Sequence, residues 1–228
     1  MNITVPVITI DGPAAVGKGT IGYLLSKRLR WHYLDSGTIY RVLVFSALHH
    51  KISLTAEKSL VSMAMNLDIR FSRKNGISEI IFEDKNISNM IYMEEVGKLA
   101  SEIAIFPKLR KALQCKFRTF LSLPGLIADG RDMGTVVFPD AIVKIFLDAN
   151  VEERSRRRML QLQKKGFNVK FEQLLDELKQ RDKRDSNRKI APLKPAKDAM
   201  IIDSSGLSIE QVFEKVLKNV LLQLSLCS

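Results

Sequence analysis

Residues 5–20 read Val5-Pro6-Val7-Ile8-Thr9-Ile10-Asp11-Gly12-Pro13-Ala14-Ala15-Val16-Gly17-Lys18-Gly19-Thr20. The apolar, β-rich run up to Ile10 is typical of a strand that is buried on both faces. A glycine-rich segment then interrupts it, and apolar residues recur at helical spacing from Ile21 to Leu29. A strand, a glycine-rich loop and a helix in this order predict the opening of a βαβ unit.

Similar apolar runs recur further along the chain, at residues 126–128, 142–147 and 200–202, with helical stretches between them. This alternation predicts an α/β fold with a central parallel sheet covered on both sides. The last helix is expected to start at Ser208, because Gln211 stands at the spacing of a capping box.

Residues 67–87 do not follow this alternation. Two β-like runs flank Asn75-Gly76 there, and Asn-Gly between such runs is a strong hairpin signal, because both residues of the turn need positive φ. We therefore expect a small antiparallel insert at residues 63–100, and a core formed by residues 1–62 and 101–228.

Composition excludes several classes of protein. The chain has 228 residues, 46% of them hydrophobic and 27% charged, as in an ordinary globular protein. No apolar stretch approaches the roughly 20 residues that span a bilayer, and the N-terminus lacks the pattern of a signal peptide. The two cysteines, Cys115 and Cys227, form no CxxC pair, so we expect a reducing, cytoplasmic location.

The charge indicates anionic partners. The 36 Lys and Arg residues outnumber the 25 Asp and Glu residues, for a net charge of +11. Residues 151–189, which have a helical pattern, hold 13 basic residues against 7 acidic ones. Nucleic acid, a membrane surface and nucleotide phosphates are all compatible with this balance.

The loop from Gly12 to Thr20 has the pattern of a P-loop. Glycines allow backbone N–H groups to turn inward around phosphate oxygens, the following helix contributes its dipole, and Lys18 adds a full charge. This predicts binding of a nucleoside triphosphate. The usual Mg²⁺-binding hydroxyl directly after the lysine is replaced by Gly19, so Mg²⁺ would be held by Thr20 or through water by a carboxylate such as Asp35 or Asp129.

Two further segments favour a second anion site. Ser36 is a candidate N-cap of a helix that carries Arg41, and Arg131 follows a strand at the end where α/β sheets bind ligands. A plain capped helix and a simple turn are the alternatives. Arg181, Asp185 and Arg188 are spaced to share one face of a helix, where the alternative is a solvated ion pair.

Four ordered motifs together resemble the bacterial cytidylate (CMP) kinases. They are Asp-Gly-Pro-x-x-x-Gly-Lys-Gly-Thr from Asp11, Leu-Asp-Ser-Gly-Thr-Ile-Tyr-Arg from Leu34, Asp-Gly-Arg-Asp-Met-Gly-Thr from Asp129, and Arg-x-x-x-Asp-x-x-Arg from Arg181. The resemblance covers nearly the whole chain. It implies a P-loop NTPase-type three-layer fold, a CMP-binding insert at residues 63–100 and a helical lid at about 151–189.

The resemblance also implies roles for single residues. Gly12, Pro13, Ala14, Ala15, Val16, Gly17, Lys18, Gly19 and Thr20 would bind ATP, with Arg157 reaching it from the lid. Ser36, Arg41 and Arg131 would hold the acceptor phosphate, and Ser101, Arg110, Asp132 and Arg188 would read the cytosine. Arg181 and Asp185 would contact the ribose, and Lys18, Arg131 and Arg181 would be catalytic.

A carboxylate facing the N4 amino group of cytosine would find no donor on uracil, which gives a reason for preferring CMP to UMP. ATP and Mg²⁺ are the expected cofactors, with CMP and dCMP as acceptors. We expect a monomer with no membrane or nucleic-acid partner. The alternatives are another P-loop kinase, acting on a different nucleoside monophosphate or a sugar- or shikimate-type acceptor, and an RNA-binding module, which the 7% aromatic content disfavours.

Overall fold

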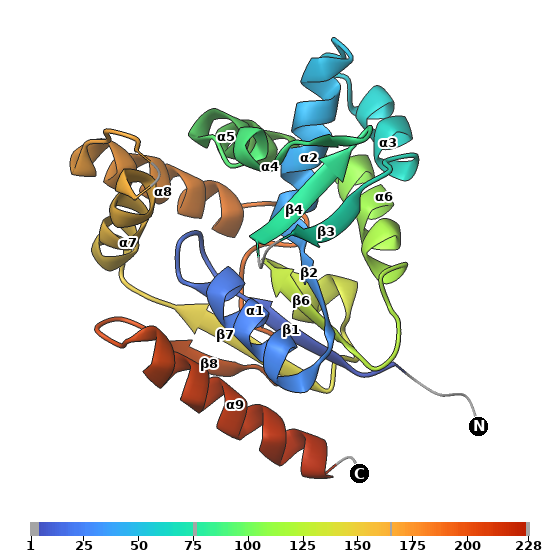
Figure 1. The fold of residues 1–228 in the computed structure, drawn as a ribbon. Helices are drawn as coiled ribbons and strands as arrows, with labels where there is room; N and C mark the ends of the chain where they lie inside the picture. The colour runs from blue at the N-terminus through green and yellow to red at the C-terminus, as the bar shows by residue number, and fades with distance from the viewer. Residues whose placement is uncertain (1–4, 75–76, 165, 227–228) are drawn as a thin grey trace. The chain divides into compact units, whose positions relative to one another are not determined.

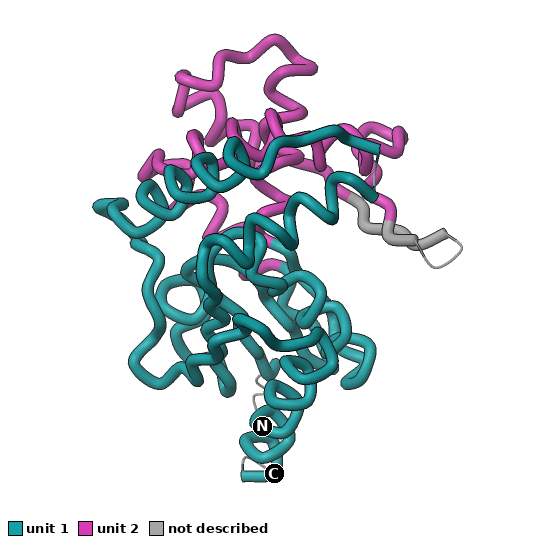
Figure 2. Tube along the Cα trace, turned by 90° about the vertical axis from the view of Figure 1, so that its left-hand side faces the viewer, with its two compact units in different colours: residues 1–35, 120–228 teal, residues 36–119 magenta. Residues whose placement is uncertain are grey.

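The computed structural model describes residues 5–74, 77–164 and 166–226. The chain divides into two compact units. Unit 1 comprises residues 1–35 and 120–228, and unit 2 comprises residues 36–119 (Figure 2).

Unit 1 is built on a five-stranded parallel sheet (Figure 1). Its strands are β1 (Val7–Asp11), β2 (His32–Asp35), β6 (Leu126–Gly130), β7 (Val143–Asp148) and β8 (Met200–Asp203), in the order β2-β6-β1-β7-β8. The four predicted apolar runs are confirmed as strands. Strand β2 was not predicted, because only Leu34 among its four residues is fully buried and the run is too short to show a period.

The helices of unit 1 are α1 (Lys18–Leu29), α7 (Val151–Gln163), α8 (Phe171–Ser186) and α9 (Ile209–Leu226), with a π-helical turn, η1 (Met133–Val137). Helices α1 and α9 pack side by side on one face of the sheet (Figure 1). Ile21 and Leu25 of α1 and Val216 of α9 form one apolar core with Ile8 and Ile145 of the strands. The expected central sheet with flanking helices is therefore confirmed.

The predicted capping box opens α9. The Gln211 backbone N–H donates to Ser208 Oγ at 3.2 Å, and the Ser208 N–H donates to Gln211 Oε1 at 2.9 Å. Both residues thus satisfy donors that a helix start leaves open.

Unit 2 combines helices with a small antiparallel sheet. The helices are α2 (Ser36–His49), α3 (Glu57–Met65), α4 (Ser88–Ile91), α5 (Glu94–Ile103) and α6 (Pro107–Arg118), and the strands are β3 (Arg70–Lys74), β4 (Ile77–Phe82) and β5 (Lys85–Asn86). Antiparallel pairing of β3 with β4 confirms the predicted hairpin. Its Asn75-Gly76 turn lies outside the described residues.

The antiparallel sheet falls within the insert that was predicted at residues 63–100. The compact unit around it is wider, since it also contains α2, α3 and α6. The assignment of CMP binding to residues 63–100, and of a lid to 151–189, stays a prediction. No helix among the described residues is long and apolar enough to cross a membrane.

Candidate active site

The glycine-rich loop runs from the end of β1 into α1. Gly12 has φ 149°, and a Cβ there would overlap the carbonyl oxygen of Leu147, so no other residue fits. Gly17, which caps α1, has φ 104°, a conformation that favours glycine. The two glycines therefore allow the backbone to turn tightly at the N-terminus of α1, as the P-loop pattern predicts.

Lys18 lies buried over this loop, with 6% of its surface exposed. Its Nζ donates to the carbonyl oxygen of Pro13 at 2.7 Å. Burial, followed by the nearby Arg131, lowers the pKa of Lys18 to about 7. Few water molecules can surround a buried ammonium group, so an anionic phosphate in the loop would interact strongly with it.

Two carboxylates stand at the carboxyl ends of neighbouring strands. Asp35 of β2 and Asp129 of β6 are register partners, and Asp129 is 5% exposed. Burial, followed by the charge of Asp35, raises the pKa of Asp129 to about 7. The structure thus places a carboxylate pair beside Lys18, at the edge of the sheet where parallel α/β proteins bind ligands.

Arg131, which is partly buried, forms an ion pair with the buried Asp185. Arg131 Nε donates to Asp185 Oδ2 at 2.9 Å. Burial alone would raise the pKa of Asp185, but the charges of Arg131, Arg181 and Arg188 outweigh it and hold that pKa below its usual range. The sequence left open a solvated ion pair on the helix face of Arg181 and Asp185, but Asp185 is only 5% exposed and so its carboxylate is not a solvated surface group.

The three residues predicted to share one helix face do so only in part. Helix α8 carries Arg181 and Asp185 but ends at Ser186, so Arg188 lies beyond it and that part of the prediction is wrong. Arg188 turns back, and its Nη2 lies 3.5 Å from Asp185 Oδ1. The carbonyl of Asp185 also accepts from the N–H of Leu193, which ties down the segment after the helix.

Asp11 holds the segment that carries Asp132, a role that sequence reasoning missed. Its two carboxylate oxygens accept from the N–H groups of Met133 and Gly134, each at 2.8 Å. These are N–H groups at the start of η1, which lack partners within the turn. Burial raises the pKa of Asp11 to about 6, against the opposing effect of these two hydrogen bonds. An acidic residue directly before the loop glycine was the available signal.

Two arginines of α7 donate hydrogen bonds to backbone carbonyls of the loop. Arg154 Nη1 donates to the carbonyl of Ala14 at 3.2 Å, and Arg157 Nη1 donates to that of Val16 at 3.4 Å. Arg157 also pairs with Glu153 and bonds to Ser204. Arg157 was predicted to contact ATP, and this stays a prediction, while the bracing role of Arg154 was missed.

Four predicted substrate residues belong to unit 2. Ser36 is the buried first residue of α2. Arg41 Nη1 donates to the carbonyl of Ile91 at 2.9 Å, and Arg110 Nη1 donates to that of Ala104 at 3.0 Å. Within the described residues, the buried Oγ of Ser101 has no hydrogen-bond partner. The roles expected of these residues remain predictions.

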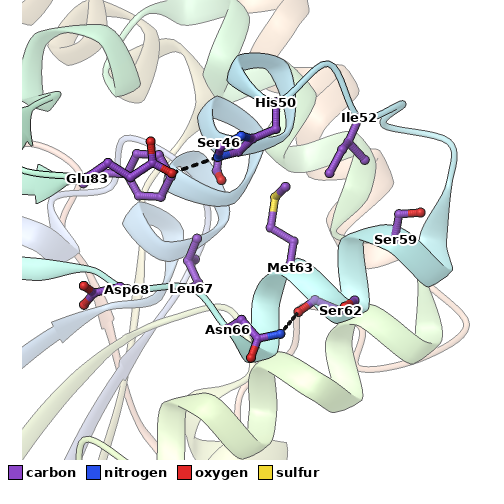
Figure 3. Close-up of a pocket in the computed structure, with 11 residues that line it drawn as sticks. Ser46, His50, Ile52, Ser59, Ser62, Met63, Asn66, Leu67, Asp68 and Glu83 are labelled. Carbon is purple, nitrogen blue, oxygen red and sulfur yellow. Dashed lines mark hydrogen bonds and ion pairs between the residues drawn. The ribbon is translucent and has the colours of Figure 1, made fainter.

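Unit 2 also contains a pocket of about 420 Å³ (Figure 3). It is lined by residues of α2, α3 and β4 and of the segments that follow them, among them His50, whose Nε2 lies 2.9 Å from Glu83 Oε1. None of the predicted substrate residues lines this pocket. It is therefore not part of the candidate site.

Metal binding was predicted at Thr20, which is exposed in the first turn of α1. Among the described residues, no group of three His, Cys, Asp or Glu side chains is arranged to hold a metal ion by itself. The oxygen donors near the loop, Thr20, Asp35 and Asp129, are of the type that Mg²⁺ prefers. They fit a Mg²⁺ ion that also has phosphate and water ligands.

A parallel sheet of this order, with a glycine loop over the start of α1 and a lysine and arginines gathered at the strand ends, defines a P-loop kinase fold. The model of one family, described as cytidylate kinase, matches residues 8–221. Curated cytidylate kinases from Shigella sonnei and Citrobacter koseri are each 58% identical over 218 residues, which is 96% of this chain and 96% of each relative. The chain belongs to the cytidylate kinase family.

Among solved structures, TT1252 from Thermus thermophilus is 18% identical to this chain. The match covers 97% of this chain and 99% of that one, with a TM-score of 0.47.

Proposed function

We propose that this protein transfers the γ-phosphoryl group of ATP to CMP, giving ADP and CDP. The observation that carries the proposal is the 58% identity to cytidylate kinases along 96% of the chain. The loop geometry supports it, since Lys18 lies buried over a loop whose glycines permit a phosphate-binding turn.

Phosphoryl transfer asks little covalent chemistry of the protein. It needs donor and acceptor in line, with positive charge around the transferred group. Lys18, Arg131 and Arg181 would supply that charge. The acceptor phosphate is already anionic near neutral pH, so no side chain is needed to remove a proton from it.

The resemblance assigns residues to the phosphate and to the ribose of the acceptor. Ser36, Arg41 and Arg131 would bind the phosphate of CMP, whose oxygens match guanidinium and hydroxyl donors. The ribose would lie against Arg181 and Asp185, and dCMP would be accepted if the contact to the 2′-hydroxyl is weak.

The cytosine edge would be read by Ser101, Arg110, Asp132 and Arg188. A buried hydroxyl without a protein partner, as at Ser101 Oγ among the described residues, is the kind of group that a ligand satisfies. A carboxylate at Asp132 would accept from N4 of cytosine, and it would face the oxygen of uracil unfavourably.

The donor would be ATP in the loop from Gly12 to Thr20, with Arg157 as a further contact. Mg²⁺, when bound, would neutralise charge on the phosphates and orient them. Thr20 and the Asp35–Asp129 pair are the residues that would hold it, directly or through water. We also propose a cytoplasmic, monomeric enzyme without a nucleic-acid partner.

The deciding experiment measures ADP release from ATP and Mg²⁺ with CMP, dCMP, UMP, AMP and GMP as acceptors. We expect turnover to be greatest with CMP and dCMP. Turnover that is greatest with another nucleotide would contradict the proposed acceptor. If no nucleotide supports ADP release, sugars and shikimate are the next acceptors to measure.

A further inference from the structure

Tyr33 contacts Asp129, one of the two carboxylates near the loop, although no motif in the sequence singles it out. It lies on β2 opposite Ile127 of β6, so Asp129 is its diagonal neighbour two residues further along β6. Residues related in this way point to the same face of a sheet, and an aromatic side chain is long enough to bridge them. The Tyr33 hydroxyl donates to Asp129 Oδ2 at 2.7 Å.

The sequence of α1 leaves room for this ring. A Cβ at Gly22 would lie 2.7 Å from Cε2 of Tyr33, closer than real Cβ contacts allow. Glycine inside a helix costs about 1 kcal/mol relative to alanine, so its presence at this position needs a reason. The close approach of the Tyr33 ring provides one, and residues 22 and 33 therefore act as a matched pair.

The hydrogen bond acts on a carboxylate whose orientation matters. Asp129 is 5% exposed, and its charge interacts with both Lys18 and Asp35. A carboxylate can turn about its side-chain bonds, whereas one oxygen bonded to a fixed phenol holds the group in a single orientation. Phenylalanine would pack equally well at this position, so the hydroxyl of Tyr33 indicates that the hydrogen bond to Asp129 matters.

We propose that Tyr33, seated against Gly22, is a positioning residue that holds the Asp129 carboxylate in the orientation required beside Lys18 for phosphoryl transfer. Tyr33 touches neither nucleotide in this proposal. Its loss should therefore slow turnover and leave substrate affinity nearly unchanged. The inference rests on the proposed kinase activity and adds a residue to its site.

The first test compares Tyr33→Phe with the wild-type chain. The variant keeps the ring and removes only the hydroxyl. We expect kcat to fall by about 10- to 100-fold, the range expected from the loss of a hydrogen bond to a charged group, while KM for CMP and for ATP changes less than about 2-fold. The matched control is Tyr23→Phe, a change on α1 at a ring that packs near Lys27 instead, and it should leave kcat within about 2-fold.

The second test uses Gly22→Ala, which should displace the ring and so reproduce the loss of kcat. Because alanine favours the helix, the midpoint temperature of thermal unfolding should fall much less than kcat does. In the Tyr33→Phe background, Gly22→Ala should cause little further loss of kcat, since the hydroxyl that it displaces is already absent. Equal losses from Gly22→Ala in both backgrounds would overturn the coupling and the proposal with it.

Two other results would also overturn the inference. One is a kcat for Tyr33→Phe within 2-fold of wild type, and the other is a fall in ATP affinity, measured by calorimetry, as large as the fall in kcat. The second result would mean that the loop itself has collapsed. If the wild-type chain phosphorylates an acceptor other than CMP, the proposed function fails, and the same comparison made with that acceptor still decides the role of Tyr33. A wild-type chain inactive with every acceptor would overturn both.

Discussion

Two regions of unit 1 contain buried charged groups, and the pKa values of their carboxyl groups shift in opposite directions. Around the phosphate loop, burial dominates, so the pKa values of Asp11 and Asp129 rise and that of Lys18 falls towards neutrality. Around Asp185, ion pairing dominates, so the pKa of this carboxyl falls and that of Arg131 rises although burial opposes both shifts. The carboxyl groups of both regions are buried, and the regions differ in whether burial or the summed effect of opposite charges decides the direction of the pKa shift.

This difference suggests different roles for the two regions. In the Asp185 cluster one carboxylate lies within ion-pairing distance of both Arg131 and Arg188. In the loop region burial decides the pKa shifts of Lys18 and Asp129, and a phosphate and its cation would interact with these charges on binding.

Lys18→Ala should have the largest effect. Loss of the buried cation should reduce turnover by at least about 10²- to 10³-fold, the scale for removing one charge-stabilising group. The fold should stay intact, because the variant removes a buried charge whose pKa is already lowered. Steady-state kinetics and thermal unfolding measure the two effects, with the exposed Lys27→Ala as control. Near-normal turnover would contradict the loop assignment.

Arg181→Met addresses the Asp185 cluster. If this cluster only held the structure together, the change would act on stability alone. We expect kcat or KM for CMP to worsen by about 10- to 100-fold, well beyond the effect of a surface ion pair. Lys183→Met, an exposed cation on the same helix, is the matched control and should be close to wild type. Unchanged kinetics would make Arg181 a purely structural residue.

Asp132→Asn connects the two regions, since Asp132 follows Arg131 and its charge affects Asp11. An amide can donate to the oxygen of uracil, which a carboxylate cannot. The ratio of kcat/KM for CMP to that for UMP should therefore fall by about 10-fold. The check is the same assay with both acceptors. A ratio equal to that of wild type would mean that the base is read elsewhere.

The smallest effect is on the pH dependence of stability. The folded-state pKa of Asp11 is raised from 3.8 to about 6, so the folded protein binds its proton more tightly, and this residue weakens stability as pH rises from about 4 to 6. Asp185 has a lowered pKa, so its contribution is present above about pH 4 and is lost as pH falls further.

Urea unfolding of wild type, Asp11→Asn and Asp185→Asn between pH 3 and 7 measures both trends. Relative to Asp11→Asn, the wild type should lose on the order of 1–3 kcal/mol between pH 4 and 6. Relative to Asp185→Asn, it should gain stability from pH 3 to 5. Parallel curves for the three proteins would show that the two regions do not differ in this way.

Much of the fold could be predicted from local patterns. The apolar runs at β1, β6, β7 and β8, the hairpin pairing of β3 with β4, and the capping box at Ser208 and Gln211 are all present. Strand β2 was missed because it has only four residues, of which only Leu34 is buried, so that it shows no apolar pattern. Arg188 was assigned to a helix because spacing alone does not show that α8 stops at Ser186.

Sequence by itself predicted the phosphate loop, the strands β1, β6, β7 and β8 and the hairpin of β3 and β4, because each of these leaves a signal within about ten neighbouring positions. Only the tertiary structure decided that Asp11 holds the start of η1, that Arg154 braces the loop and that Tyr33 bonds to Asp129. The last pair is separated by 96 positions. Contacts of that kind arise when strands pair and helices pack, and no local pattern records them.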